Sequence, residues 1–215
     1  NNILQCRGIS FIHPRRSSFS SPFVLTLDDF SLKSGEVVAL MGPNGSGKST
    51  FSRLLCGLDT PSEGTIILDE TPCNKERLER SVGYMFQNPD YQIFLPQVKD
   101  ELSYSLSFLK INEKEKEKRL SETAALFSLS LSDTASLMSY GERKRLQSAI
   151  YYSLDRPFYI LDELDRALTY KESISILEKL SRNGAGILLI THDDDFASAV
   201  ADRGYRAKEG RIYEE

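Results

Sequence analysis

A glycine-rich segment around residue 45 contains the residue types that bind phosphate. It reads Gly42-Pro43-Asn44-Gly45-Ser46-Gly47-Lys48-Ser49-Thr50 and fits the pattern G-x-x-x-x-G-K-[ST]. Glycines let backbone N–H groups surround the β-phosphate of a nucleotide without a Cβ in the way. Lys48 supplies a positive charge for the β- and γ-phosphates, and the Ser49 hydroxyl is a ligand for Mg²⁺. This phosphate loop, residues 42–50, predicts a nucleoside triphosphate site.

The phosphate loop lies between a predicted strand and a predicted helix, as its chemistry requires. Residues 37–41 form an apolar run typical of a buried strand, and residues 49–56 have a helical pattern that ends at Gly57. The positive end of such a helix adds to the phosphate site. A phosphate loop alone is compatible with kinases, GTPases, motor ATPases and transporter ATPases, so the later motifs must decide.

The rest of the chain predicts an α/β protein. Apolar runs of strand length at 158–161 and 187–191, with a helical face at 170–182 between them, indicate a parallel sheet covered by helices on both sides. Hairpin-like segments within residues 3–36, together with residues 64–68, predict a small antiparallel sheet beside that core.

Two regions fall outside the strand pattern. Residues 97–155 show no convincing strand and predict several helices, one of which carries alternating charges at 112–119, typical of a solvated face. The Ser-rich segment 15–22 predicts a surface loop.

Four further segments follow the phosphate loop in order. They contain a glutamine, a Ser-x-Gly pair, two acids that end an apolar strand, and a histidine: Gln87 in 85–89, Ser139 and Gly141 in 138–146, Asp162 and Glu163 in 158–163, and His192 in 188–193. The series resembles the Walker A, Q-loop, signature, Walker B and switch histidine of ATP-binding cassette (ABC) ATPases. The resemblance covers residues 3–214. It implies a single domain with a P-loop NTPase core (1–87 and 156–215), a flanking antiparallel β subdomain and an inserted α-helical subdomain (about 88–155).

The resemblance also implies a role for each of these side chains in Mg²⁺-dependent ATP hydrolysis, with Lys48 among the catalytic residues. Asp162 would hold Mg²⁺ through its waters, and Gln87 would complete the ion's shell and sense the γ-phosphate. Glu163 would orient or deprotonate the attacking water, a role worth about 10²–10⁴-fold in rate. His192 would link the γ-phosphate to Glu163. His13 falls where the family usually has an aromatic residue stacked on adenine, although a surface histidine is the alternative.

Members of the family act as dimers, and three positions depart from their usual pattern. Ser139 and Gly141 would donate hydrogen bonds to the γ-phosphate held by the partner subunit. Tyr140 and Glu142 replace a glycine and a glutamine of the signature. Thr169 stands where an aspartate usually crosses the dimer interface. That departure favours a subunit of an asymmetric pair, and sequence drift explains it nearly as well.

Residues 86–94 resemble the corresponding stretch of energy-coupling-factor (ECF) ATPases, which power uptake of vitamins and of cobalt or nickel ions. Exposed Tyr91, Ile93 and Phe94 would anchor a helix of the transmembrane subunit. Packing inside the helical subdomain is the alternative. ATPases of other importers, a soluble ABC ATPase of DNA repair or translation, and a regulatory subunit without turnover also remain open.

The composition bears on the partners of the protein and on its cellular compartment. Acidic residues outnumber basic ones by 31 to 27, a net charge of −4, which argues against a general nucleic-acid binder. The three scattered cysteines contain no C-x-x-C pair and fit a reducing compartment. With the resemblance, we expect a cytoplasmic protein on the inner face of the cell membrane. The sequence does not specify the transported substrate, because specificity in such systems lies in other subunits.

Overall fold

The computed structural model describes residues 1–13, 21–166 and 168–215. Most of the loop predicted at 15–22, and Ala167 in the segment before Thr169, lie outside these ranges. Contacts between residues divide the chain into two compact units. The first contains Asn1–Tyr84, Pro157–Glu163 and Gly184–Glu215, and the second contains Met85–Arg156 and Leu164–Asn183.

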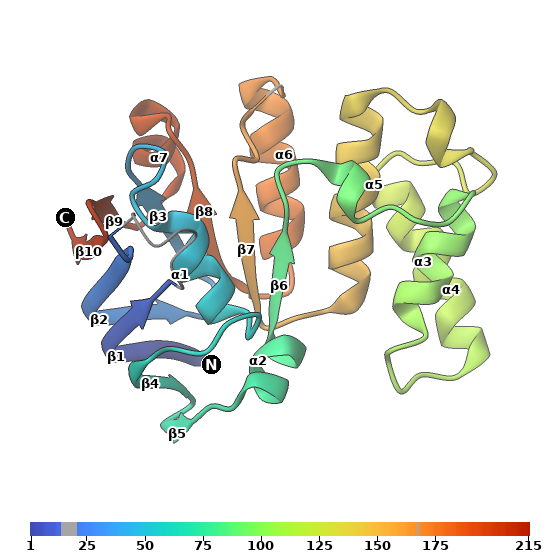
Figure 1. Ribbon diagram of the computed structural model, residues 1–215. Helices are drawn as coiled ribbons and strands as arrows, with labels where there is room; N and C mark the ends of the chain where they lie inside the picture. The colour runs from blue at the N-terminus through green and yellow to red at the C-terminus, as the bar shows by residue number, and fades with distance from the viewer. Residues whose placement is uncertain (14–20, 167) are drawn as a thin grey trace. The chain divides into compact units, whose positions relative to one another are not determined.

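The centre of the sheet in the first unit is parallel, as predicted. Strand β3 (Val37–Met41) pairs with β8 (Gly186–Ile190) on one side and with β9 (Arg203–Lys208) on the other, and β8 pairs with β7 (Phe158–Asp162). Figure 1 shows these strands side by side. Ile190 lies opposite both Leu40 and Asp162. The carboxyl ends of β3, β7 and β8 are therefore level, and the segments that follow them emerge at one edge.

The antiparallel strands β1 (Ile3–Ile12), β2 (Val24–Lys33) and β4 (Glu63–Leu68) pair with one another as predicted. They do not form a separate sheet. A single sheet runs in the order β5-β4-β1-β2-β10-β9-β3-β8-β7-β6, where β5 is Thr71–Pro72, β6 is Val82–Met85 and β10 is Arg211–Glu214. The hairpin β9–β10 joins the two parts, because β10 pairs with β2 and β9 with β3.

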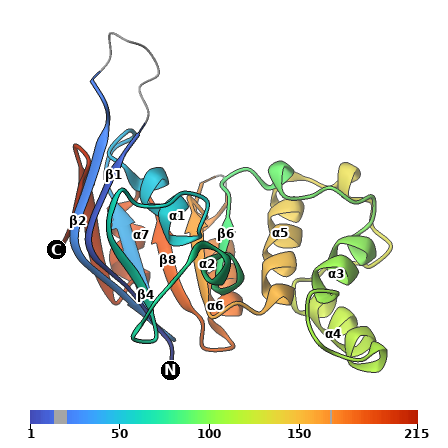
Figure 2. The same cartoon turned by 60° about the horizontal axis from the view of Figure 1, so that its bottom comes forward.

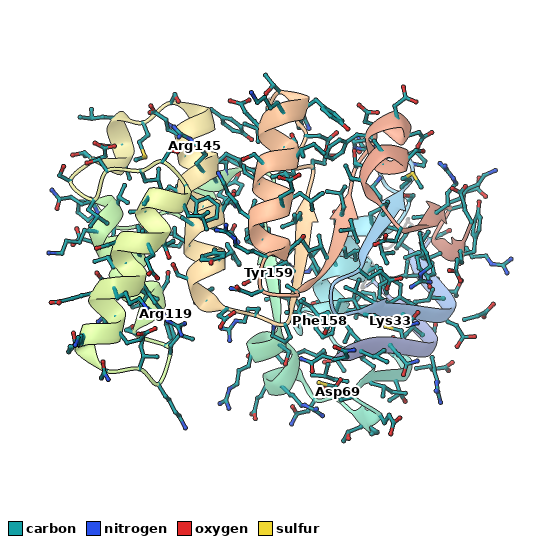
Figure 3. All side chains as sticks on the ribbon, turned by 180° about the vertical axis from the view of Figure 1, so that it is seen from behind. Lys33, Asp69, Arg119, Arg145, Phe158 and Tyr159 are labelled. Atoms are coloured by element: carbon teal, nitrogen blue, oxygen red, sulfur yellow. The ribbon has the colours of Figure 1, made fainter. Side chains whose placement is uncertain are left out.

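Helices of the first unit bury apolar faces. Helix α1 (Lys48–Leu55) matches the helix predicted at 49–56, and its Phe51 packs edge-on against Phe30 of β2 at 5.1 Å between ring centroids. The shorter helices are α2 (Lys75–Ser81) and α7 (Asp194–Val200), capped by Asn74 and Asp193. At the start of β8, a Cβ on Gly186 would lie 2.9 Å from the Phe158 ring and 2.5 Å from the Lys33 carbonyl oxygen, so the position requires glycine (Figure 3).

The second unit is helical, as predicted for residues 97–155. It contains α3 (Val98–Leu106), α4 (Glu113–Leu126), α5 (Tyr140–Leu154) and α6 (Tyr170–Ser181), with the short 3₁₀ turns η1 (Pro89–Tyr91) and η2 (Ala135–Leu137). Figure 2 shows α3, α4 and α5 packed together. Their shared core includes Val98, Leu102, Leu120, Phe127 and Leu146. No helix in the described ranges is long and apolar enough to cross a membrane.

Candidate functional site

The phosphate loop has a backbone that only glycine adopts without strain. Gly42, Gly45 and Gly47 have φ angles of 145°, 76° and 111°. A Cβ on Gly42 would lie 2.2 Å from the carbonyl oxygen of Ala207, and one on Gly47 would lie 2.7 Å from Leu25 Cδ1. Both the backbone angles and the surrounding atoms therefore require glycine at these two positions.

The phosphate loop contacts the β9–β10 hairpin and contains a buried hydroxyl, that of Ser46, which could bind a ligand. The Gly210 N–H donates to the carbonyl oxygen of Ser46 at 3.1 Å. The Ser46 hydroxyl oxygen is buried and makes no hydrogen bond within the described residues. Buried polar groups are normally satisfied, so this hydroxyl fits a loop built around a bound anion. The exposed Ser49 and the buried Thr50 follow at the start of α1.

Lys48 is held inside the loop. Its side chain donates to the carbonyl oxygens of Gly42 and Pro43, the latter at 2.9 Å, and the residue is only 7% exposed. Burial lowers the pKa of its ammonium group, and the nearby charges of Glu163 and Asp162 oppose that shift. The lysine therefore lies at the N-terminus of α1, near the carboxylates of Asp162 and Glu163.

Asp162, the last residue of β7, is hydrogen-bonded by Tyr84, a residue that belongs to none of the sequence motifs. The Tyr84 hydroxyl donates to Asp162 Oδ2 at 2.8 Å. Burial and the charge of Asp162 raise the pKa of the Tyr84 phenol, so it remains a donor. Tyr84 lies in the apolar strand β6, where nothing in the sequence distinguishes it from an ordinary core residue. Carboxylate and hydroxyl oxygens, here from Asp162 and Ser49, suit Mg²⁺.

Glu163 and His192 meet beside Asp162. Glu163 has a φ of 49°, an uncommon left-handed conformation for a side chain of this size, and its N–H donates to Ile190 O at 2.8 Å. Its carboxylate contacts His192 Nε2, and the glutamate side chain is 11% exposed against 42% for the histidine. A mostly buried carboxylate oriented by an accessible imidazole is an arrangement suited to accepting a proton from water.

His13 lies in an aromatic group near the loop. Its ring packs edge-on against Phe11 at 5.1 Å and lies 6.4 Å from Phe23 between ring centroids. The backbone N–H of His13 donates to the Phe23 carbonyl oxygen at 2.9 Å. Phe23 in turn comes within 3.3 Å of the position that a Cβ on Gly47 would take. Phe23 is thus a second aromatic candidate for stacking on a base. It was missed because it follows a loop and belongs to no motif.

Ser139 is the N-cap of α5 in the second unit, and Gly141 lies in the first turn of that helix. The Ser139 oxygen accepts the N–H of Glu142 at 3.2 Å, and the Glu142 carboxylate accepts the N–H of Ser139 at 2.8 Å. This capping box explains the glutamate at position 142 and leaves the Ser139 hydroxyl proton available. Among the described residues, the nearest atom that a Cβ on Gly141 would meet is Leu168 Cδ2, at 4.0 Å.

Comparison with known proteins now decides the family. A sequence profile described as ABC transporter matches residues 25–165. The chain belongs to the ABC transporter family. It is 34% identical over 184 residues to "Energy-coupling factor transporter ATP-binding protein EcfA1" of Thermotoga maritima, covering 83% of this chain and 70% of that protein. It is also 32% identical over 218 residues to a "Putative ABC transporter ATP-binding protein" of Bacillus cereus.

The Bacillus cereus relative is much longer than this chain, and solved ABC structures share the fold of this chain. The alignment with the Bacillus cereus relative takes in 98% of this chain but only 38% of that protein, so the chain spans well under half of its length. Among solved structures, CbiO1 of Clostridium perfringens, described as part of the ABC transporter complex CbiONQ, is similar with a TM-score of 0.83 and 27% identity. That match covers 98% of this chain and 86% of the other. The predicted ABC ATPase fold is confirmed.

The departure at Thr169 from the usual ABC pattern has a local structural role. Thr169 is the N-cap of α6: its hydroxyl oxygen accepts the N–H of Glu172 at 3.2 Å, and the Glu172 carboxylate accepts the N–H of Thr169 at 2.8 Å. This capping box stabilises the first turn of the helix. An aspartate, a strong N-cap residue, could also cap α6.

The ABC segment after Gln87 presents two of the three predicted docking residues. Tyr91 and Phe94 are 69% and 78% exposed. Ile93, in contrast, is half-buried and packs against the helical core. The expectation that Ile93 is exposed was therefore wrong. The turn is fixed by Glu101, a buried residue of α3 whose carboxylate accepts the N–H groups of Phe94 and, at 2.6 Å, Leu95.

Proposed function

We propose that this chain is the ATP-binding and hydrolysing subunit of a membrane ABC importer of the ECF type, which takes up a vitamin or a transition-metal ion. The contact between Glu163 and His192, beside the Asp162 carboxylate, supports ATP hydrolysis. An ATP-binding protein without turnover would have no need of this pair. Identity of 34% with the Thermotoga maritima ECF subunit supports the transport class.

Different residues of this chain would bind the phosphates, activate the attacking water and hold Mg²⁺. The glycines and Lys48 bind the phosphates, and the Ser46 hydroxyl adds a donor. Glu163 accepts the proton of the attacking water while His192 holds its carboxylate in place. Mg²⁺, when bound, would neutralise the charge that develops on the phosphates. The Ser49 hydroxyl would ligate the ion, Asp162 would hold it through its waters, and Gln87 is a further proposed ligand.

Gly141 supports a dimer in which this chain completes its partner's site. Glycine is a poor helix former and costs about 1 kcal/mol relative to alanine in a helix interior. Yet the nearest atom of the described residues that a Cβ on Gly141 would meet is 4.0 Å away. Packing against the described residues of the second unit therefore does not explain the glycine. Close approach of the partner's γ-phosphate does, and the available Ser139 proton would serve the same phosphate.

Exposed Tyr91 and Phe94 form the proposed docking surface for a transmembrane subunit. Large aromatic side chains at this exposure suit a pocket-filling role in an interface. Docking there would hold the chain at the cytoplasmic face of the membrane as a peripheral subunit. The other ATPase subunit is proposed to be a related, non-identical chain, because Thr169 lacks the carboxylate usual at that position.

One experiment tests the function directly. The purified chain, and the chain co-expressed with a candidate membrane subunit and a second ATPase subunit, are assayed for Mg²⁺-dependent release of phosphate from ATP. We expect turnover that EDTA abolishes and that the Glu163→Gln variant loses. Nucleotide binding with no release of phosphate in any of these assemblies would contradict the proposal.

A further inference from the structure

Helix α5 holds the backbone of the Gln87 segment through three polar side chains. The Tyr140 hydroxyl donates to the carbonyl oxygen of Gln87 at 3.1 Å. Lys144 Nζ donates to the carbonyl oxygens of Phe86 and Gln87, each at 2.9 Å. Gln147 Nε2 donates to the carbonyl oxygen of Phe86 at 2.9 Å. The spacing of four and then three residues places the three side chains on one face of the helix, and we call this set the clamp.

Two of the three clamp side chains are buried, and one of these is a lysine. Lys144 and Gln147 are both fully buried. Lysine is almost never buried completely unless its donors are satisfied, and hydrogen bonds from an ammonium group are stronger than those between neutral groups. Loss of Lys144 would remove one of the two side-chain donors to each of these carbonyl oxygens and leave only Gln147 on Phe86 and Tyr140 on Gln87. The clamp is therefore costly to open.

The peptide on the other side of Phe86 is held as well. Gln92 Oε1 accepts the N–H of Phe86 at 3.0 Å and also receives a hydrogen bond from Gln147. Gln92 Nε2 donates to the Tyr151 hydroxyl at 2.6 Å. Both polar groups of residue 86 are thus bound to side chains that belong to α5 or contact it.

The position of Tyr140 gives the clamp its significance. Tyr140 stands between Ser139 and Gly141, where the ABC signature usually has a glycine, and its hydroxyl reaches the residue that is proposed to sense the chain's own nucleotide. The same few residues of α5 would therefore contact the partner's γ-phosphate at one end and the Q-loop backbone along one face.

We propose that Tyr140 and Lys144 are positioning residues that join the Gln87 segment to the start of α5, so that the two proposed nucleotide sites of the dimer change state together. The inference rests on the proposed function. A shift of the Gln87 peptide cannot occur without either moving the start of α5 or breaking these hydrogen bonds. The clamp would thereby transmit nucleotide binding at one site to the signature residues of the other.

Tryptophan reporters can test this, because the chain contains no tryptophan. Tyr91→Trp reports on the Gln87 segment and Leu137→Trp on the segment before Ser139, at positions 69% and 85% exposed. Each reporter is mixed with ATP and Mg²⁺ in a stopped-flow fluorimeter. With the clamp intact, we expect the two signals to change with the same rate constant.

Tyr140→Phe and Lys144→Met each remove donors of the clamp and keep most of the side-chain volume. We expect the two rate constants to separate by about fivefold for each hydrogen bond lost. The control is Tyr152→Phe, the same chemical change on α5 at a ring that packs against Phe127. Coincident rate constants in the double variant Tyr140→Phe/Lys144→Met would overturn the inference.

A second measurement separates failure of the clamp from failure of the proposed function. Binding of ATP to the parent chain is measured first, and absence of binding contradicts the function. Hydrogen exchange of amides 86–95 without nucleotide then tests the clamp by itself. Faster exchange in Tyr140→Phe and Lys144→Met, but not in Tyr152→Phe, supports it. Unchanged exchange in correctly folded variants, as judged by circular dichroism, overturns it.

Discussion

The carboxylate of Glu163 and the imidazole of His192 are in contact, although one follows β7 and the other follows β8. Adjacent parallel strands in level register bring the two turns together: Asp162 pairs with Ile190, and the Glu163 N–H donates to the Ile190 carbonyl oxygen. The left-handed backbone of Glu163 is fixed by that hydrogen bond. The sheet, more than any local interaction, thus determines the position of the proposed catalytic carboxylate.

Glu163→Gln should separate ATP binding from ATP hydrolysis. The amide keeps the size of the carboxylate and can still contact His192, but it cannot accept a proton from water. We expect turnover to fall by about 10²-fold or more with ATP affinity retained, and an ATP-bound dimer to accumulate on size-exclusion chromatography. Glu178→Gln, at an exposed site on α6, is the control. Unchanged turnover in Glu163→Gln would remove this residue from its proposed role.

Lys48→Met should abolish tight nucleotide binding while the fold persists. The Lys48 ammonium group already sits inside the loop on the carbonyl oxygens of Gly42 and Pro43. Loss of hydrogen bonds from a charged donor to a phosphate should weaken ATP binding by about 10–100-fold. Equilibrium titration with a fluorescent ATP analogue measures this. An affinity equal to that of the parent would show that the lysine does not contact the phosphates.

Thr169 offers a comparison between a cap and a charge. Thr169→Ala removes the N-cap of α6 and should cost about 1 kcal/mol of unfolding free energy. Thr169→Asp keeps a capping oxygen and adds the carboxylate usual at this interface position, so we expect it to raise turnover of the homodimer. Denaturant unfolding and steady-state ATPase assays measure the two effects. A fast parent homodimer that gains nothing from Thr169→Asp would leave the asymmetric pair without support.

Phe94→Ala and Ile93→Ala should have different consequences, because only Phe94 is exposed. Phe94→Ala should weaken co-purification with a transmembrane subunit and leave basal ATP hydrolysis and the melting temperature near those of the parent. Ile93→Ala removes part of the helical core and should lower the melting temperature. If Phe94→Ala co-purifies as well as the parent, the docking surface lies elsewhere.

Local patterns were enough to predict the elements that carry the phosphate loop and the final acids. Residues 37–41 and 158–161 are continuous apolar runs of strand length, and a glycine-rich turn with a lysine between a strand and a helix is typical of a phosphate site. The signature and Gln87 were proposed from their order along the chain. These features depend on neighbours in the sequence, so a single sequence reveals them.

Features that depend on distant neighbours were missed. Strands β9 and β10 are short, and alternating charged residues hide their buried Tyr205, Ala207 and Ile212, so the joined sheet was not predicted. Glu101 and Lys144 were not singled out from the sequence, although both are buried and bind backbone groups outside their own helices. The sequence pattern predicts which residues avoid water in a regular element. It does not predict which charged side chain will form hydrogen bonds with the backbone groups of a loop elsewhere in the fold.

The Ala207 carbonyl beneath Gly42, and the Gly210 N–H on Ser46, make the β9–β10 hairpin the floor of the phosphate loop. Natural or selected variants that lose nucleotide affinity need not map to any recognised motif. Gly210 itself has a φ of 81°, and a Cβ there would lie 2.1 Å from the Val24 carbonyl oxygen. A larger residue at position 210 would shift the β9–β10 hairpin and thereby displace the phosphate loop. Tolerance of the nucleotide site to evolutionary change is therefore limited by a hairpin that lies outside every recognised motif.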